Sequence, residues 1–183
     1  IAVTSNVTVQ ELRLYGAYTM DISGSFTATD GYRFYDSASL TKNGTGTLNM
    51  TSAEALAAVA DGKLTINAGT LHFTDTLAGN GSANNTNADA DFSSLSIAAN
   101  ASLSIIGAER NGDSNIRTTV KLGSGFAGKL IVKGGWLDSD SDLGGASALV
   151  FDGGNLLARD TRNNHTISTN IEIGATGTTF AHL

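Results

Sequence analysis

The sequence predicts an all-β protein, a parallel β-solenoid whose short strands end and restart at glycine-centred corners. Three observations predict it: 22 Gly and no Pro among 183 residues, short runs of alternating apolar residues, and a nine-residue pattern that recurs along the chain. Pro cannot donate to a strand ladder, whereas Gly adopts the backbone conformations of tight corners. A chain of this length can bury one continuous core, so we expect a single domain over residues 1–183.

Alternating apolar residues predict strands in the first fifty positions. A strand places every second side chain on the same face, so each alternation directs its apolar residues to one interior. The segment Asn43 to Gly46 reads as a corner between two of these runs. The apolar positions are Val7, Val9, Leu12, Leu14, Met20, Ile22, Phe26, Tyr32, Phe34, Leu40, Leu48 and Met50.

One short helix is predicted near residues 52–61. Thr51 and Glu54 have the spacing of a capping box, residues 55–60 are good helix formers, and Gly62 is a suitable end signal. A helix of two to three turns is too short to be a domain. We expect an insertion that lies against one turn of the solenoid.

Segments 63–71, 129–137 and 148–156 align without gaps, and from its second residue each reads Leu, any residue, an apolar residue, any two, Gly, any residue, Leu. A looser copy has Asn100 at the Gly position, where Asn best replaces Gly in the left-handed conformation. Copies beginning at Leu64, Leu95, Leu130, Leu149 and Ile171 are 31, 35, 19 and 22 residues apart. The short intervals match one turn of about 20 residues, and the long ones contain polar excursions at 79–91 and 107–115.

Segments 40–50 and 62–73 resemble the autotransporter-associated β-strand repeat of bacterial surface proteins, and segments 149–156, 167–173 and 177–180 resemble the turn that commonly follows it. The resemblance covers residues 40–73 and 122–180 well and residues 1–39 poorly. It implies a right-handed parallel β-helix outside the cell, with roles in adhesion, self-association or matrix structure. Because the chain begins at Ile1, without Met or a signal region, we expect a fragment or processed piece of a longer surface protein.

Charge and composition exclude several classes of function. The net charge is −6 and the eleven basic residues are scattered, so we expect no nucleic-acid partner. No run approaches the roughly 18 apolar residues of a membrane span, so we expect no membrane insertion of this segment. Without Cys there is no disulfide and no thiolate metal site.

Asp138, Asp140 and Asp142 alternate, and such carboxylates can converge on Ca²⁺. Leu143 and Leu149 stand where the helix-loop-helix calcium motif has Gly and Glu, so the favoured interpretation is a solvated acidic corner, with no cofactor. A second alternating set, Asn85, Asn87, Asp89 and Asp91, is interpreted as a polar loop with turns stabilised by its own side chains.

Trp136, Tyr32 and Tyr35 are candidate ligand-binding residues. Rings of this kind form platforms on which sugars stack, and Tyr15 and Tyr18 belong to the same set. Aromatic residues at solenoid corners equally well cap the apolar interior, and the sequence leaves both interpretations open.

No catalytic constellation is apparent, and we expect no enzyme. The sequence lacks a Gly-x-Ser-x-Gly nucleophile elbow, and His72, His165 and His182 have no partner set evident from spacing. The alternative is a carbohydrate-active β-helix enzyme or a glycan-binding module. Parallel β-helices that cleave polysaccharides use charged residues on an exposed face; here these would be Asp152, Arg159, Asp160 and Arg162, a set also explained as a mixed-charge edge.

The sequence therefore favours an extracellular structural or adhesive scaffold on a bacterial cell surface. Unpaired strand edges at the ends of a solenoid are templates for joining another chain. The expected partners are the protein itself or a host or matrix surface.

Overall fold

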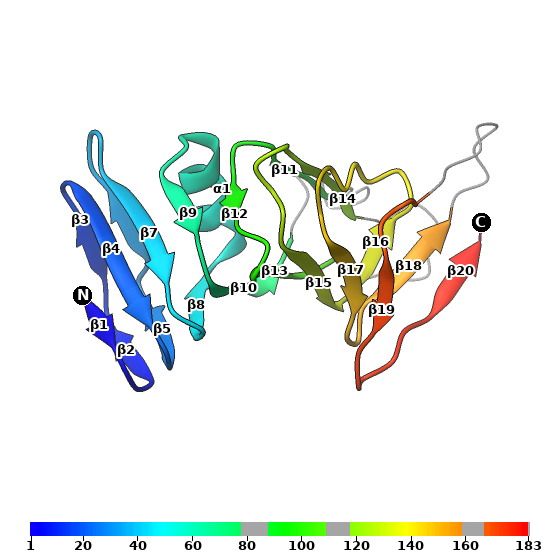
Figure 1. Ribbon diagram of the computed structural model, residues 1–183, viewed down its shortest axis with the longest axis horizontal. Coiled ribbons are helices and arrows are strands. Elements are labelled where there is room, and N and C mark those ends of the chain that lie inside the picture. Colours follow the sequence, from blue (N-terminus) through cyan, green and yellow to red (C-terminus); the bar gives the residue numbers. More distant parts are fainter. Residues whose placement is uncertain (78–87, 109–117, 159–166, 183) are drawn as a thin grey trace.

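The computed structural model describes residues 1–77, 88–108, 118–158 and 167–182. It is mostly β with one helix, and every pairing between its named strands is parallel. The prediction of an all-β chain with parallel sheets and one short helix is confirmed. Figure 1 shows the chain advancing along its long axis, with β1 and β20 at opposite ends.

The strands form four sheets, which we call first, long, third and short. The first sheet has the order β1 (Ala2–Val3), β4 (Ala17–Ile22), β7 (Ser39–Asn43), β9 (Leu64–Ile66), β12 (Ser96–Ile97). The long sheet has the order β2 (Val7–Val9), β5 (Ser25–Ala28), β8 (Thr47–Met50), β10 (Gly69–Thr76), β13 (Ala101–Ile106), β15 (Lys129–Gly134), β17 (Ala148–Phe151), β19 (Ile171–Ile173). The third sheet has the order β11 (Ala88–Phe92), β14 (Thr118–Leu122), β16 (Trp136–Asp138), β18 (Asn155–Ala158), β20 (Phe180–His182), and the short sheet contains β3 (Leu12–Leu14) and β6 (Tyr32–Phe34).

The register of the long sheet aligns eight apolar residues in one column. Neighbours in the column are 19 to 32 residues apart along the chain. Its six inner members are at most 5% exposed, so the column forms the centre of the core. Its members are Val7, Phe26, Leu48, Leu71, Leu103, Leu130, Leu149 and Ile171.

The internal copies do not all have the same place in the fold, contrary to the prediction. Leu64 pairs with Leu40 in the first sheet, whereas Leu130 pairs with Leu103 and Leu149 in the long sheet. The copy at 63–71 therefore forms the corner from the first to the long sheet, and the copy at 129–137 forms the corner from the long to the third sheet. Any inward strand, glycine corner and inward strand produces the same pattern, so the pattern identifies a corner but not which corner.

The corners require glycine where the backbone enters the left-handed region. Gly69 has φ +72° and Gly135 has φ +65°. In the third copy the left-handed residue is Gly153, with φ +98°, one position before the aligned glycine. Asn100 does not adopt the predicted left-handed conformation. In the described part of the chain, Asp36 is the only non-glycine residue with positive φ.

The predicted helix is α1 (Ser52–Ala60). Its capping box is formed: the Thr51 hydroxyl accepts from the Glu54 N–H, and the Glu54 carboxylate accepts from the Thr51 N–H at 3.2 Å. In the long sheet, β2 is followed by β3 and β5 is followed by β6. The next strand of that sheet, β8, is followed by the helix. It packs against β10 and β11.

One predicted polar loop is in part a strand. Residues 79–91 were expected to form an excursion, yet Ala88–Phe92 is β11 and pairs with β14 over its full length. Asp89 and Asp91 are exposed while Ala90 and Phe92 are buried, so this segment has the alternation of a half-buried strand. Asn85 and Asn87 lie outside the described residues.

No helix in the described ranges is long and apolar enough to cross a membrane.

Candidate functional site

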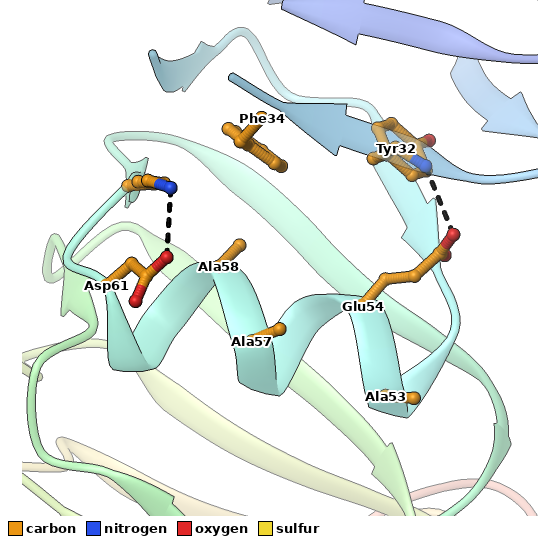
Figure 2. A pocket seen from close by; sticks show the side chains of 8 residues that line it. Tyr32, Phe34, Ala53, Glu54, Ala57, Ala58 and Asp61 are labelled. Atoms are coloured by element: carbon orange, nitrogen blue, oxygen red, sulfur yellow. Dashed lines mark hydrogen bonds and ion pairs between the residues drawn. The ribbon is translucent and has the colours of Figure 1, made fainter. Parts of the chain in front are cut away.

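A groove of about 340 Å³ lies between β6 and α1 (Figure 2). Phe34 and Tyr32 line its strand side, and Ala53 and Ala57 project from the helix on the other side. Both alanine side chains are exposed and Phe34 is half-buried. Charged residues stand at its two ends, and the complete lining is Tyr32, Phe34, Ala53, Glu54, Ala57, Ala58, Asp61 and Lys63.

Glu54 connects the helix to β6. Its carboxylate accepts from the Tyr32 N–H at 3.1 Å and from the Thr51 hydroxyl at 2.7 Å. At the other end of the groove Lys63 forms an ion pair with Asp61 at 2.9 Å. The groove therefore has an apolar middle and fixed charges at its ends, which Figure 2 shows on opposite sides of the alanines.

Tyr32, a predicted ligand-binding residue, is buried. Only 7% of it is exposed, and its hydroxyl donates to the Asn49 carbonyl at 2.6 Å. Burial raises the pKa of Tyr32 above its ordinary value. The ring packs edge-on against Phe26, so Tyr32 is part of the core and the groove wall. It is not an open stacking platform.

Tyr35, the second candidate, forms a stacked pair with Tyr15. The ring centroids are 4.5 Å apart and the planes differ by 6°. Tyr15 is 65% exposed. The two residues directly follow β6 and β3, whose register is parallel, and this pairing explains why the rings stack.

Arg13 and Arg33 lie beside this aromatic pair, directly opposite one another in the short sheet. Two like charges at this position repel one another, and the Glu11 carboxylate accepts a hydrogen bond from each guanidinium. These two bonds hold the pKa of Glu11 below its ordinary value. More than half of each Arg side chain is exposed.

Trp136, the third candidate, lies on β16 of the third sheet and is half-buried. Its backbone N–H donates to the Ala108 carbonyl at 3.0 Å. It is therefore on a different sheet from Tyr32 and Tyr35, and the three do not form one platform.

Two of the three candidate metal ligands, Asp138 and Asp142, accept hydrogen bonds within local turns. The Asp138 carboxylate accepts from the Asp140 N–H at 2.9 Å, and the Asp142 carboxylate accepts from the Gly144 N–H at 3.0 Å. Asp138 is fully buried, so the prediction of a solvated acidic corner is wrong for this residue. The described part of the chain contains no group of three or more His, Cys, Asp or Glu residues that could hold a metal ion.

A second groove, of about 420 Å³, crosses the outer face of the long sheet. His72 and Ser104 are neighbours there, with Nδ1 and Oγ 3.1 Å apart. Burial and, beyond it, the charge of Lys133 lower the pKa of His72. Ser104 is only 1% exposed. No partner for His72 was evident from the spacing of residues along the chain, and it is the register of β10 and β13 that brings Ser104 beside it.

Asp152, the candidate acid of the enzyme alternative, stabilises a corner. Its carboxylate accepts from Lys133 Nζ at 2.7 Å and from the Thr176 N–H at 3.1 Å. The Lys133 bond, followed by the Thr176 bonds, lowers the pKa of Asp152 to about 2. Arg159, Asp160, Arg162 and His165 lie outside the described residues.

The strands at the C-terminal end of the structure expose apolar side chains. Ile171 is 41% exposed, Ile173 52% and Phe180 57%. Each pairs in register with a residue that is at most 9% exposed, namely Leu149, Phe151 and Leu156 respectively. These exposed residues occupy the same columns as the core.

Comparisons with protein-family models, with curated proteins and with solved structures give no match to this chain.

Proposed function

We propose that this chain is a right-handed parallel β-solenoid that acts as an extracellular structural or adhesive scaffold of a bacterial surface protein. The resemblance of residues 40–73 and 122–180 to the autotransporter-associated repeat supports this proposal. The parallel pairing of strands 19 to 32 residues apart is the spacing expected of successive solenoid turns. The outward face of the long sheet carries neutral polar residues such as Thr27, Asn49 and Thr70, as on secreted β-proteins.

One observation carries the scaffold proposal: Ile171, Ile173 and Phe180 continue the core columns but are exposed. Fully burying an apolar side chain of this size contributes roughly 1.5–3 kcal/mol. Among the described residues, no strand pairs with the outer edge of β19, so its backbone groups are available there. Further turns of a longer polypeptide and a second copy of the chain would each supply both an apolar face and a strand edge. For the chain by itself, we infer that copies associate through their solenoid ends.

Light scattering of the purified chain over a wide concentration range tests this association. We expect the apparent mass to rise with concentration, and Ile171→Thr combined with Ile173→Thr to suppress the rise. Thr retains strand propensity while removing apolar surface. Tyr18→Thr is a matched control, because Tyr18 is 40% exposed but lies on the first sheet. A chain that stays monomeric at high concentration would remove the support for self-association.

A glycan-binding module is the second candidate, and the stacked Tyr15–Tyr35 pair favours it. An exposed ring face with two guanidinium groups nearby suits a sugar that carries a carboxylate or sulfate, since rings stack on pyranose faces and Arg binds such anions.

Titration of the protein with acidic oligosaccharides, followed by NMR, tests the glycan proposal. We expect shifts at Tyr15 and Tyr35 that are lost in Tyr15→Ala and kept in Tyr18→Ala. Equal responses from both variants would contradict binding at this pair.

A further inference from the structure

After most strands of the long sheet, the next element is a strand of the short or third sheet. After β8, a helix takes the place of that strand. The strands that follow β2, β5, β10, β13, β15 and β17 belong to the short or third sheet, whereas β8 is followed by α1. As a result β6 pairs with β3 on one edge, and no strand of the described residues pairs with its other edge. That free edge borders the groove of Figure 2.

The backbone groups on the free edge of β6 follow from its hydrogen bonds. Leu12 donates to the Gly31 carbonyl and Tyr35 donates to the Leu14 carbonyl, so Gly31 and Tyr35 face β3. Alternate residues of a strand hydrogen-bond on opposite edges, and Tyr32 and Phe34 therefore face the groove. The Glu54 carboxylate already accepts from the Tyr32 N–H. The Phe34 N–H and the Tyr32 carbonyl are the groups on this edge that an extended backbone would bind.

The helix leaves space beside this edge. It packs against β10 and β11. Ala53 and Ala57, one turn apart on α1, face the groove with the smallest side chains other than Gly. The gap of about 340 Å³ between them and Phe34 is open to solvent.

The short sheet also defines the side chains that such an added strand would carry. Its two register rows of apolar residues, Leu12 with Tyr32 and Leu14 with Phe34, flank a row of two Arg residues. Arg33 is exposed and shares one carboxylate, that of Glu11, with Arg13. A residue directly opposite Arg33 on a third strand is favoured when it is acidic, and its neighbours are favoured when they are apolar.

We propose that this groove is a peptide-binding site at which an extended segment of another polypeptide adds as a strand to β6, with an acidic residue opposite Arg33 and apolar residues on either side. In a parallel added strand, the backbone N–H of the acidic residue donates to the Tyr32 carbonyl, and the backbone carbonyl of the same residue accepts from the Phe34 N–H. Strand addition gives affinity through the main chain and specificity through alternate side chains.

The probe is a capped peptide of sequence Thr-Val-Glu-Val-Thr, titrated into labelled protein and followed by NMR. We expect the Phe34 amide to shift and its hydrogen exchange to slow. Methylating the backbone nitrogen of the peptide Glu abolishes binding, because that N–H faces β6, whereas methylating the nitrogen of the following Val, which faces away, leaves most of it.

Two variant pairs make the test specific to the groove. Ala57→Trp fills the groove and abolishes binding, whereas Ala60→Trp, an exposed position of the same helix outside the lining, does not. Arg33→Glu weakens binding by about threefold and a Lys-containing peptide restores it, in keeping with the usual strength of a cross-strand ion pair. Failure of the peptide to affect the Phe34 amide, or binding that Ala57→Trp leaves intact, overturns the proposal. Neither result depends on whether copies of the chain associate.

Discussion

Lys42 occupies a core position. In the first sheet it pairs in register with Met20 and Ile66, and it is 0% exposed. Its Nζ reaches the corner between the first and long sheets, where it donates to the Gly44 carbonyl at 2.9 Å and the Ala68 carbonyl at 2.7 Å. The ammonium group therefore ties two successive corners together.

The stability of the protein is expected to depend on pH through Lys42. Burial lowers the pKa of Lys42 to about 8 from its ordinary value of 10.5. Between these values the unfolded chain binds more protons than the folded chain, so this group makes the free energy of unfolding rise with pH. Urea unfolding between pH 7 and 10.5 measures the rise, which Lys42→Met removes.

Comparing the unsubstituted protein with Lys42→Met separates the contribution of Lys42 to the pH dependence from that of other groups that titrate in the same range. Lys63 is a suitable control, since its ammonium group is paired at the surface with Asp61. If Lys63→Met flattens the pH dependence as much as Lys42→Met does, the assignment to Lys42 is wrong.

Single residues were predicted from the sequence only where their type is restrictive. The left-handed corners at Gly69 and Gly135 could be predicted because few other residues tolerate that conformation. The burial of Lys42 could not be predicted, because a charged residue at an inward position interrupts the alternation of apolar and polar residues and suggests an exposed site. The depth of Tyr32 was equally hidden, since a ring at a corner fits both a platform and a core.

At the scale of elements, α1 depends on one carboxylate. Glu54 completes the capping box and accepts from the Tyr32 N–H of β6. We expect Glu54→Ala to lower the free energy of unfolding by about 1–3 kcal/mol, because a cap and a partly buried acceptor are lost together. Glu54→Gln retains one acceptor oxygen and is expected to cost less. Urea denaturation of both variants measures the difference, and equal losses would contradict the acceptor role.

Element boundaries were predictable where local signals were strong. The helix was predicted from its capping box and its glycine end, both of which are local. The strand β11 was missed because Asp89 and Asp91 suggest a loop, although Ala90 and Phe92 alternate with them. The groove beside β6 could not be predicted, since it depends on which strand the helix packs against.

At the scale of the whole molecule, the column of apolar residues along the long sheet is buried at all six of its inner positions, and we expect it to contribute strongly to stability. Leu103 lies between Leu71 and Leu130, and all three are 0% exposed. We expect Leu103→Ala to cost about 2–5 kcal/mol, the usual range for a buried Leu. Val7→Ala, at the half-buried end of the same column, serves as the control and is expected to cost clearly less. Similar shifts in the urea midpoint would contradict a core centred on this column.

The parallel architecture was predictable because glycine corners, absent Pro and apolar alternation agree. The sheet to which each copy of the pattern belongs was not predictable, because the same pattern occurs at two different corners. Leu64 lies in the first sheet and Leu130 in the long sheet. Whether copies join at Ile171 and Ile173 depends on the partner surface, which the local sequence does not describe.

The short distance along the chain between paired strands of the long sheet also bears on how the chain folds. Every strand in it pairs with neighbours only 19 to 32 residues away, from β2 at one end to β19 at the other. The entropy of closing each loop is therefore similar throughout and does not grow with the length of the polypeptide. In the proposed solenoid, we expect folding to begin at any two adjacent strands and to spread in both directions, so that further turns would leave the initiating step unchanged.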